Sequence, residues 1–349
     1  MKKTNIQGRC SLSLLKQTVL FIALFLVAYW ATIGVMNYEA LDLGRNLEES
    51  EILEDMYSAQ EFITMRRETK IDFIYYVINF IAVSKSIPLE LITSLTIAIY
   101  YFIIIRLMRE SYSRKYGLFV ILTVLFTTPL VWVASVSRNL MAIMFFYVAI
   151  LLFYHNKKLL GTLFVLISVF THFSCIIYIF LLIPVFYLRK QHFSSSTIYF
   201  LLFLITILGF ILPSFISPLL SFLGSTGFSS YSSIQISNFL ISDYSYGDKI
   251  APLFAYIFSL YLMCINKHRD KEFWMLFMLT FFLSLSLNIG YNYIIRCMMF
   301  MPLIWGINIA DIYSYSPMMK KKVKTVSIVA MLPIILNIYA YRPLFFYFL

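Results

Sequence analysis

The sequence predicts an all-α polytopic integral membrane protein of about 11 transmembrane helices plus an outer half-helix, in a single transmembrane domain, residues 1–349. Of these residues, 61% are hydrophobic and only 13% are charged, which is not the composition of a soluble chain. Long apolar runs recur at the ~20-residue length that crosses a bilayer. The period-two pattern of a barrel is missing, so the spans should be helical, because backbone groups cannot stay unpaired in lipid.

The first predicted span covers residues 14–36. Together with the basic start Met1-Lys2-Lys3, this stretch is similar to a signal peptide. However, the apolar run is longer than a signal peptide requires, and no small-x-small cleavage site follows it. We therefore expect an uncleaved first helix.

The other apolar runs place the remaining helices and two long outer loops. The run 71–84 is too short to span and predicts a half-helix that returns to the outer face. An acidic outer loop at 37–72 precedes it, and a Ser-, Gly- and Tyr-rich outer loop lies at 223–249. The further predicted spans are 88–105, 117–136, 139–154, 159–171, 174–188, 196–222, 250–266, 273–289, 294–312 and 325–345.

The run Leu159–Leu188 is the most informative of these segments. Thr171-His172-Phe173-Ser174 is its only interruption, and the basic pairs Lys157-Lys158 and Arg189-Lys190 bound it. The run is too long for one span and too short for two full ones. A single crossing would also leave basic pairs on both membrane faces. We therefore predict a short-helix hairpin at 159–188, with its break near the outer surface.

Charge distribution sets the predicted orientation. With the N-terminus cytoplasmic, most of the 28 Lys and Arg residues and few of the 17 acidic residues lie in inner loops. This pattern predicts a multi-pass membrane protein with its N-terminus cytoplasmic and its C-terminus outside. The net charge of +11 then reflects topology and contact with membrane lipids, so nucleic acid is not an expected partner.

Three charged or titratable residues fall at one depth near the predicted outer face: Arg138, His172 and Arg296. A charge within the membrane costs about 2.5–3.5 kcal/mol on insertion scales, so such a residue usually faces a cavity or a partner. For Arg138, snorkelling toward headgroups is an alternative role. For His172, the alternative is a polar helix break.

Together these residues suit chemistry on a lipid diphosphate. Arginine binds phosphate oxygens through a permanently charged fork, and histidine can accept a proton near neutral pH. The four cysteines lack metal-ligand spacing, so zinc and redox motifs are not supported. No metal site and no cofactor are expected. The expected substrate-binding residues lie beside these charges or in the loop 223–249: Asn139, Ser174, Tyr291, Asn292 and Tyr244.

The motifs around these residues resemble those of Wzy-type O-antigen and capsular polysaccharide polymerases, especially the EpsG-like branch. The similar motifs are Arg138-Asn139-Leu140-Met141-Ala142, His172-Phe173-Ser174, and Arg296 with Phe300. Cys175 and the first outer loop depart from the family pattern. The resemblance implies a glycosyltransferase that moves a growing glycan from undecaprenyl diphosphate onto a lipid-linked repeat unit. It implies His172, Arg138 and Arg296 as catalytic residues, undecaprenyl-diphosphate-linked oligosaccharide as substrate, and a chain-length regulator as a further partner.

Three other functions are compatible with the sequence. An O-antigen ligase uses the same donor chemistry with a different acceptor. A transporter or flippase of lipid-linked oligosaccharide would handle the same lipid, although flippases tend to spread charges along a cavity and to carry internal repeats. A scaffold protein would tolerate replacement of Arg138, His172 and Arg296.

Overall fold

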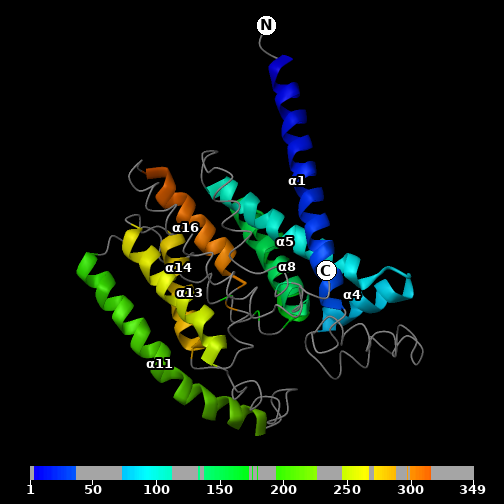
Figure 1. The fold of residues 1–349 in the computed structure, drawn as a ribbon. Helices are drawn as coiled ribbons and strands as arrows, with labels where there is room; N and C mark the ends of the chain where they lie inside the picture. The colour runs from blue at the N-terminus through cyan, green and yellow to red at the C-terminus, as the bar shows by residue number, and fades with distance from the viewer. Residues whose placement is uncertain are drawn as a thin grey trace.

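The structure is a computed structural model, and within the residues that it describes the chain is helical apart from turns (Figure 1). The described residues are 4–36, 73–111, 133, 137–172, 175, 179, 194–225, 246–266, 271–287, 297 and 299–315. The helices are α1 (Thr4–Met36), α4 (Phe73–Ser84), α5 (Leu89–Ser111), α8 (Ser137–Tyr154), α9 (Lys158–Thr171), α11 (Ser195–Ser225), α13 (Tyr246–Ile265), α14 (Lys271–Ser286) and α16 (Met301–Tyr315).

These helices are apolar, as predicted. The segments Leu14–Ile33 and Leu89–Met108 are long and apolar enough to cross a membrane, and shorter apolar helices accompany them. Large apolar side chains are exposed along α1 and α11, for example Trp30 and Phe203. An apolar outer surface is what a helix bundle presents to lipid. The loop 37–72 and the predicted span 325–345 lie outside the described residues, as do the spans 117–136 and 174–188 except for residues 133, 175 and 179. The count of about 11 spans therefore stays a prediction.

Several predicted boundaries need correction. Helix α1 begins at Thr4, ten residues before the predicted span 14–36, so it includes Arg9. Helices α11 and α13 extend into the predicted loop 223–249, because α11 ends at Ser225 and α13 begins at Tyr246. In each case the helix continues through polar residues beyond the apolar run, since helical hydrogen bonding does not require apolar side chains.

The first group of helices is built on antiparallel pairs. Helices α1 and α5 pack together, with the rings of Phe21 and Phe102 edge to face at 5.7 Å. Nearer the start of α1, the Arg106 guanidinium donates a hydrogen bond of 3.5 Å to the side-chain oxygen of Gln17. The end of α5 therefore lies beside the first half of α1. This is the pairing expected if both basic ends face the cytoplasm.

Two tight turns connect helices in this group. Helix α4 ends in a turn with Ser86 at φ 53°, and α8 ends in a turn with Asn156 at φ 59°. In both turns the next amide donates to the carbonyl five residues earlier, from Ile87 to Ala82 and from Lys157 to Leu152. This hydrogen-bond pattern is a Schellman motif, which ends a helix through one left-handed residue. It lets α5 and α9 begin within a few residues.

Small and polar residues join the second group, α11, α13, α14 and α16. Gly209 of α11 lies so close to Ser284 of α14 that an added Cβ would be 1.8 Å from the Ser284 hydroxyl. Trp305 of α16 donates a hydrogen bond of 2.9 Å to the Ser259 hydroxyl on α13. Glycine contacts and interhelical hydrogen bonds of this kind are typical of helix packing within membranes.

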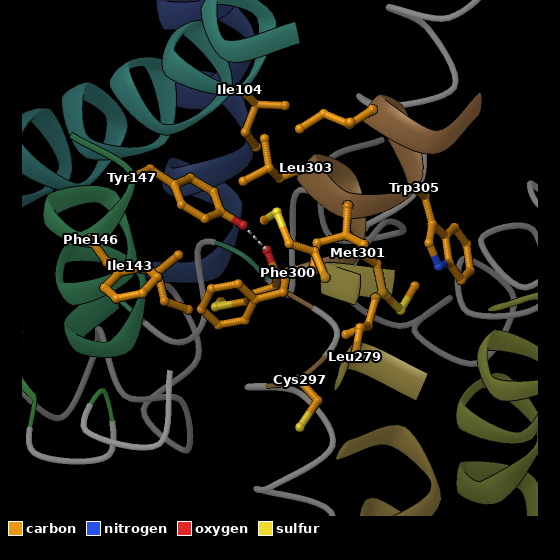
Figure 2. Close-up of a cluster of buried hydrophobic side chains, with 14 of the residues drawn as sticks. Ile104, Ile143, Phe146, Tyr147, Leu279, Cys297, Phe300, Met301, Leu303 and Trp305 are labelled. Carbon is orange, nitrogen blue, oxygen red and sulfur yellow. Dashed lines mark hydrogen bonds between the residues drawn. The ribbon is translucent and has the colours of Figure 1, made fainter. Parts of the chain in front are cut away.

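The two groups meet where α16 packs against α5 (Figure 1). The contact belongs to one buried core that also includes side chains of α8 and α14 (Figure 2). The end of α8 that begins at Ser137 and the residues just before α16 both border this core. The candidate site is built from these residues and from α4 and α9.

Candidate functional site

The site begins at the first turn of α8, where Ser137, Arg138 and Asn139 follow one another. Helix α4 holds this turn through two adjacent tyrosines. The hydroxyls of Tyr75 and Ser137 are 2.7 Å apart, and Arg138 Nη1 donates a hydrogen bond of 2.6 Å to the Tyr76 hydroxyl. The Arg138 guanidinium carbon also lies 5.7 Å from the centre of the Tyr76 ring. Tyr76 therefore fixes the position of Arg138 through its hydroxyl and its ring.

The pairing of α8 with α9 brings His172 to the same end of the helices as Arg138. The two helices are joined by a short turn and run antiparallel. The Ser168 hydroxyl donates a hydrogen bond of 2.7 Å to the Ala142 carbonyl oxygen. Arg138 lies four residues before Ala142, and His172 lies four residues after Ser168. Because each step is about one helical turn, the two residues sit at the same level of the hairpin.

His172 lies at the point where the helix breaks, as predicted. Helix α9 ends at Thr171, and His172 is extended, with φ −156° and ψ 113°. Its N–H still donates to the Ser168 carbonyl at 3.0 Å, while its own carbonyl accepts from the Cys175 N–H at 2.9 Å. The His172 side chain is only 2% exposed. The break therefore leaves the imidazole inside the bundle.

The residues just before α16 form the third side of the site. The Met299 carbonyl oxygen accepts a hydrogen bond of 3.2 Å from the Tyr147 hydroxyl (Figure 2). It also accepts one of 2.5 Å from the Tyr100 hydroxyl. The Asn139 side-chain amide is 3.4 Å from the Met299 sulfur, and Phe300 packs edge to face against the Tyr147 ring. This segment is therefore fixed against the start of α8.

This arrangement places the N-termini of two helices side by side, because Asn139 in the first turn of α8 contacts Met299, two residues before α16. A helix N-terminus carries a partial positive charge and unpaired N–H groups, which favour anions. Arg138 adds a full positive charge at the same place. The described first turns of both helices lack acidic residues. These features favour an anionic group at this position.

The start of α16 corrects one prediction. A continuous helix was expected over 294–312, with Arg296 about one turn inside it. Instead, Met299 and Phe300 form a turn and α16 begins at Met301. The cause is Pro302, which lacks an N–H and would clash with the carbonyl four residues before it, but which fits the first turn of a helix.

The structure thus brings together Arg138, Asn139 and His172 from the predicted set. Arg296, Ser174, Tyr291, Asn292 and Tyr244 lie outside the described residues, so their predicted roles stay predictions. In the described part of the chain, no three His, Cys, Asp or Glu side chains are grouped to hold a metal ion.

Sequence reasoning missed the contribution of α4. Its buried face includes Tyr75, Tyr76 and Asn79, two of which contact α8. The signal was present, since these polar or amphipathic residues recur at helical spacing within an apolar run. Sequence reasoning also missed Tyr100 and Tyr147, because each lies more than one hundred residues before Met299 in the chain.

The site lies within a segment that matches a known protein family. A family model described as the EpsG family matches residues 19–347, nearly the whole chain. The match includes every residue named in the site, from Tyr75 on α4 to Met299 before α16. No curated protein and no solved structure matches the chain.

Proposed function

The chain belongs to the EpsG family, and membership of this family suggests a polysaccharide polymerase type of function. We propose that the protein polymerises a lipid-linked glycan. The growing glycan is transferred from undecaprenyl diphosphate onto the sugar of a second lipid-linked repeat unit. The reaction takes place at the outer face of the bacterial cytoplasmic membrane. The observation that carries this proposal is the common level of Arg138 and His172 at one end of the α8–α9 hairpin.

The other end of the same hairpin supports the proposal that the reaction takes place at the outer membrane face. The turn between α8 and α9 exposes Lys157 and Lys158, a basic pair that favours the cytoplasmic face. Helix α9 has 14 residues, which rise about 21 Å at 1.5 Å per residue. This rise is shorter than the ~30 Å hydrocarbon core, so His172 would lie below the outer surface, in a polar cavity and not in open water.

In the proposed mechanism, His172 accepts the proton of the acceptor hydroxyl. The hydroxyl oxygen attacks the anomeric carbon of the donor sugar, and the bond from that carbon to the diphosphate oxygen breaks. The diphosphate leaves with the bonding electrons and remains on its lipid. Arg138, Arg296 and the N-termini of α8 and α16 stabilise the negative charge that builds on the leaving group. Tyr76 keeps Arg138 in position for this role.

The decisive experiment examines the lipid-linked glycans of cells that lack the protein. We expect single repeat units on undecaprenyl diphosphate, facing outward, with no polymer. Long polymer on the lipid carrier would instead indicate a ligase, and single repeats facing inward would indicate a flippase. Either result contradicts the proposed polymerase.

Complementation with arginine variants tests the site. Arg138→Ala should abolish polymer while the protein remains inserted, and Arg138→Lys should restore little, because lysine lacks the bidentate fork. Arg106→Ala is the matched control, since Arg106 contacts Gln17 on α1 outside the candidate site. Normal polymer from Arg138→Lys would mean that charge alone, or snorkelling, explains Arg138.

A further inference from the structure

Helix α4 carries a buried polar group that the proposed mechanism does not use. Asn79 is 2% exposed, and its side-chain Nδ2 has no hydrogen-bond partner among the residues that the structure describes. Leaving a buried amide donor unpaired costs free energy, so such groups are rare and usually have a specific role. Within a membrane helix, a buried polar side chain often marks the path of a substrate.

The position of Asn79 on α4 relates it to the candidate site. It lies three residues after Tyr76 and four after Tyr75, so all three side chains share one face of the helix. The two tyrosine hydroxyls reach Arg138 and Ser137 on α8. Asn79 is therefore just under one helical turn, about 4.5 Å along the axis, from Tyr76, which holds Arg138.

The beginning of α4 also borders α9. The rings of Phe73 and Phe170 are 6.0 Å apart, and Phe170 lies two residues before His172. Helix α4 thus contacts both arms of the hairpin that carries Arg138 and His172. A substrate group bound by Arg138 would lie against the polar face of α4.

We propose that Asn79 is a substrate-binding residue whose side-chain N–H donates a hydrogen bond to an oxygen of the lipid-linked diphosphosugar. This inference rests on the proposed function, and it adds α4 to the substrate site. The oxygen belongs either to the diphosphate or to a sugar hydroxyl, since both are acceptors. Bound substrate then supplies the partner that the Asn79 amide lacks in the described structure.

The test measures ligand stabilisation of the purified full chain in detergent. Two probes are used: undecaprenyl diphosphate, and the lipid-linked repeat unit extracted from cells that lack the protein. A ligand that binds the native state raises the melting temperature of the protein. The dependence of this rise on ligand concentration gives an apparent Kd. Asn79→Leu removes the amide at similar volume, and Asn79→Ala is a second variant in case leucine prevents folding.

We expect Asn79→Leu to melt no lower than the parent without ligand, because it removes an unpaired polar group. Its apparent Kd should rise about tenfold or more, the usual effect of losing one hydrogen bond to a charged or polar ligand. An effect with both probes assigns the amide to the diphosphate, and an effect with the sugar-bearing probe alone assigns it to a sugar hydroxyl.

Asn308→Leu is the matched control. Asn308 is also buried, but its Oδ1 accepts a hydrogen bond of 2.8 Å from Asn266 and its Nδ2 donates to the Ile304 carbonyl. This variant should melt lower than the parent and keep its apparent Kd. An unchanged Kd for both Asn79 variants with both probes would overturn the inference. If neither probe stabilises the parent protein, the proposed function itself fails, and the inference with it.

Discussion

At the scale of single residues, the structure explains how an arginine is accommodated near the core of an apolar bundle. The Arg138 guanidinium is half-buried, and Tyr76 supplies a hydroxyl acceptor and an aromatic face for it. The hydroxyl and the ring together hold the guanidinium at the first turn of α8.

The role of His172 can be separated from its place at the helix break. His172→Ala should lower the rate of polymer formation about 10²–10⁴-fold, the usual contribution of a general base, and single repeats should accumulate. His172→Asn should not restore activity, because an amide does not accept the proton. Rates are measured on lipid-linked glycan in isolated membranes.

The matched control for this prediction is His155→Ala. His155 is exposed in the turn between α8 and α9, at the end of the hairpin away from Arg138. Its replacement should leave the rate of polymer formation unchanged. Normal chain length and normal rate in both His172 variants would show that His172 only ends α9, and the mechanism would lose its base.

At the scale of helices, close approach depends on particular glycines. Gly209→Ala should destabilise the contact between α11 and α14 by about 1–3 kcal/mol, the typical cost of overpacking. The added Cβ would lie 1.8 Å from the Ser284 hydroxyl and 2.5 Å from its Cβ, and 3.2 Å from its backbone carbonyl carbon. Thermal unfolding of the purified protein should show a lower midpoint.

Two further variants check this explanation. Ser284→Gly added to Gly209→Ala should recover much of the lost stability, because it removes the atoms that clash. Gly161→Ala should cost less, since the atoms nearest to its added Cβ belong to the ring of Phe153, the first at 2.7 Å, and that side chain can rotate away. A parent-like midpoint for Gly209→Ala would mean that α11 and α14 pack less closely than described.

Helix ends show why some boundaries were predictable and others were not. The hairpin arm α9 begins at Lys158 and ends at Thr171, close to the prediction, because a basic pair and a polar break bound its apolar run. The predicted span 294–312 is interrupted by a turn at Met299 and Phe300, just before Pro302, so α16 begins only at Met301. The ends of α1, α11 and α13 extend past their apolar runs into residues that hydropathy alone does not assign to a helix.

At the scale of the whole molecule, the predicted topology assigns opposite membrane faces to two exposed turns. Lys85 lies in the turn between α4 and α5, and Lys157 lies in the turn between α8 and α9. With a membrane-impermeant maleimide on intact cells or spheroplasts, Lys85→Cys should react and Lys157→Cys should not. Both should react after the membrane is disrupted.

The parent chain is the background control for this labelling, since it carries cysteines of its own, of which Cys264 is exposed. The opposite pattern, with labelling of Lys157→Cys alone, would invert the bundle. Arg138 and His172 would then face the cytoplasm, and transfer at the outer surface would be ruled out.

The sequence alone determined the class of protein and the residues with unusual chemistry. Apolar runs of helical length predict an all-α membrane protein, because lipid leaves the backbone no other way to pair its polar groups. The same reasoning isolated Arg138 and His172, because a charged or titratable residue is conspicuous in an apolar segment. Arg296 was identified for the same reason, and its position in the site stays a prediction.

Only the tertiary structure decided which residues surround Arg138 and His172. Tyr75, Tyr76 and Asn79 share one face of a short helix, but only the structure shows that this face contacts α8. Tyr100 and Tyr147 reach Met299 from distant parts of the chain. Hydropathy reports how each side chain meets lipid or water. Contacts between helices instead depend on which faces pack together and in what register, and those are set by side-chain shape across the whole bundle.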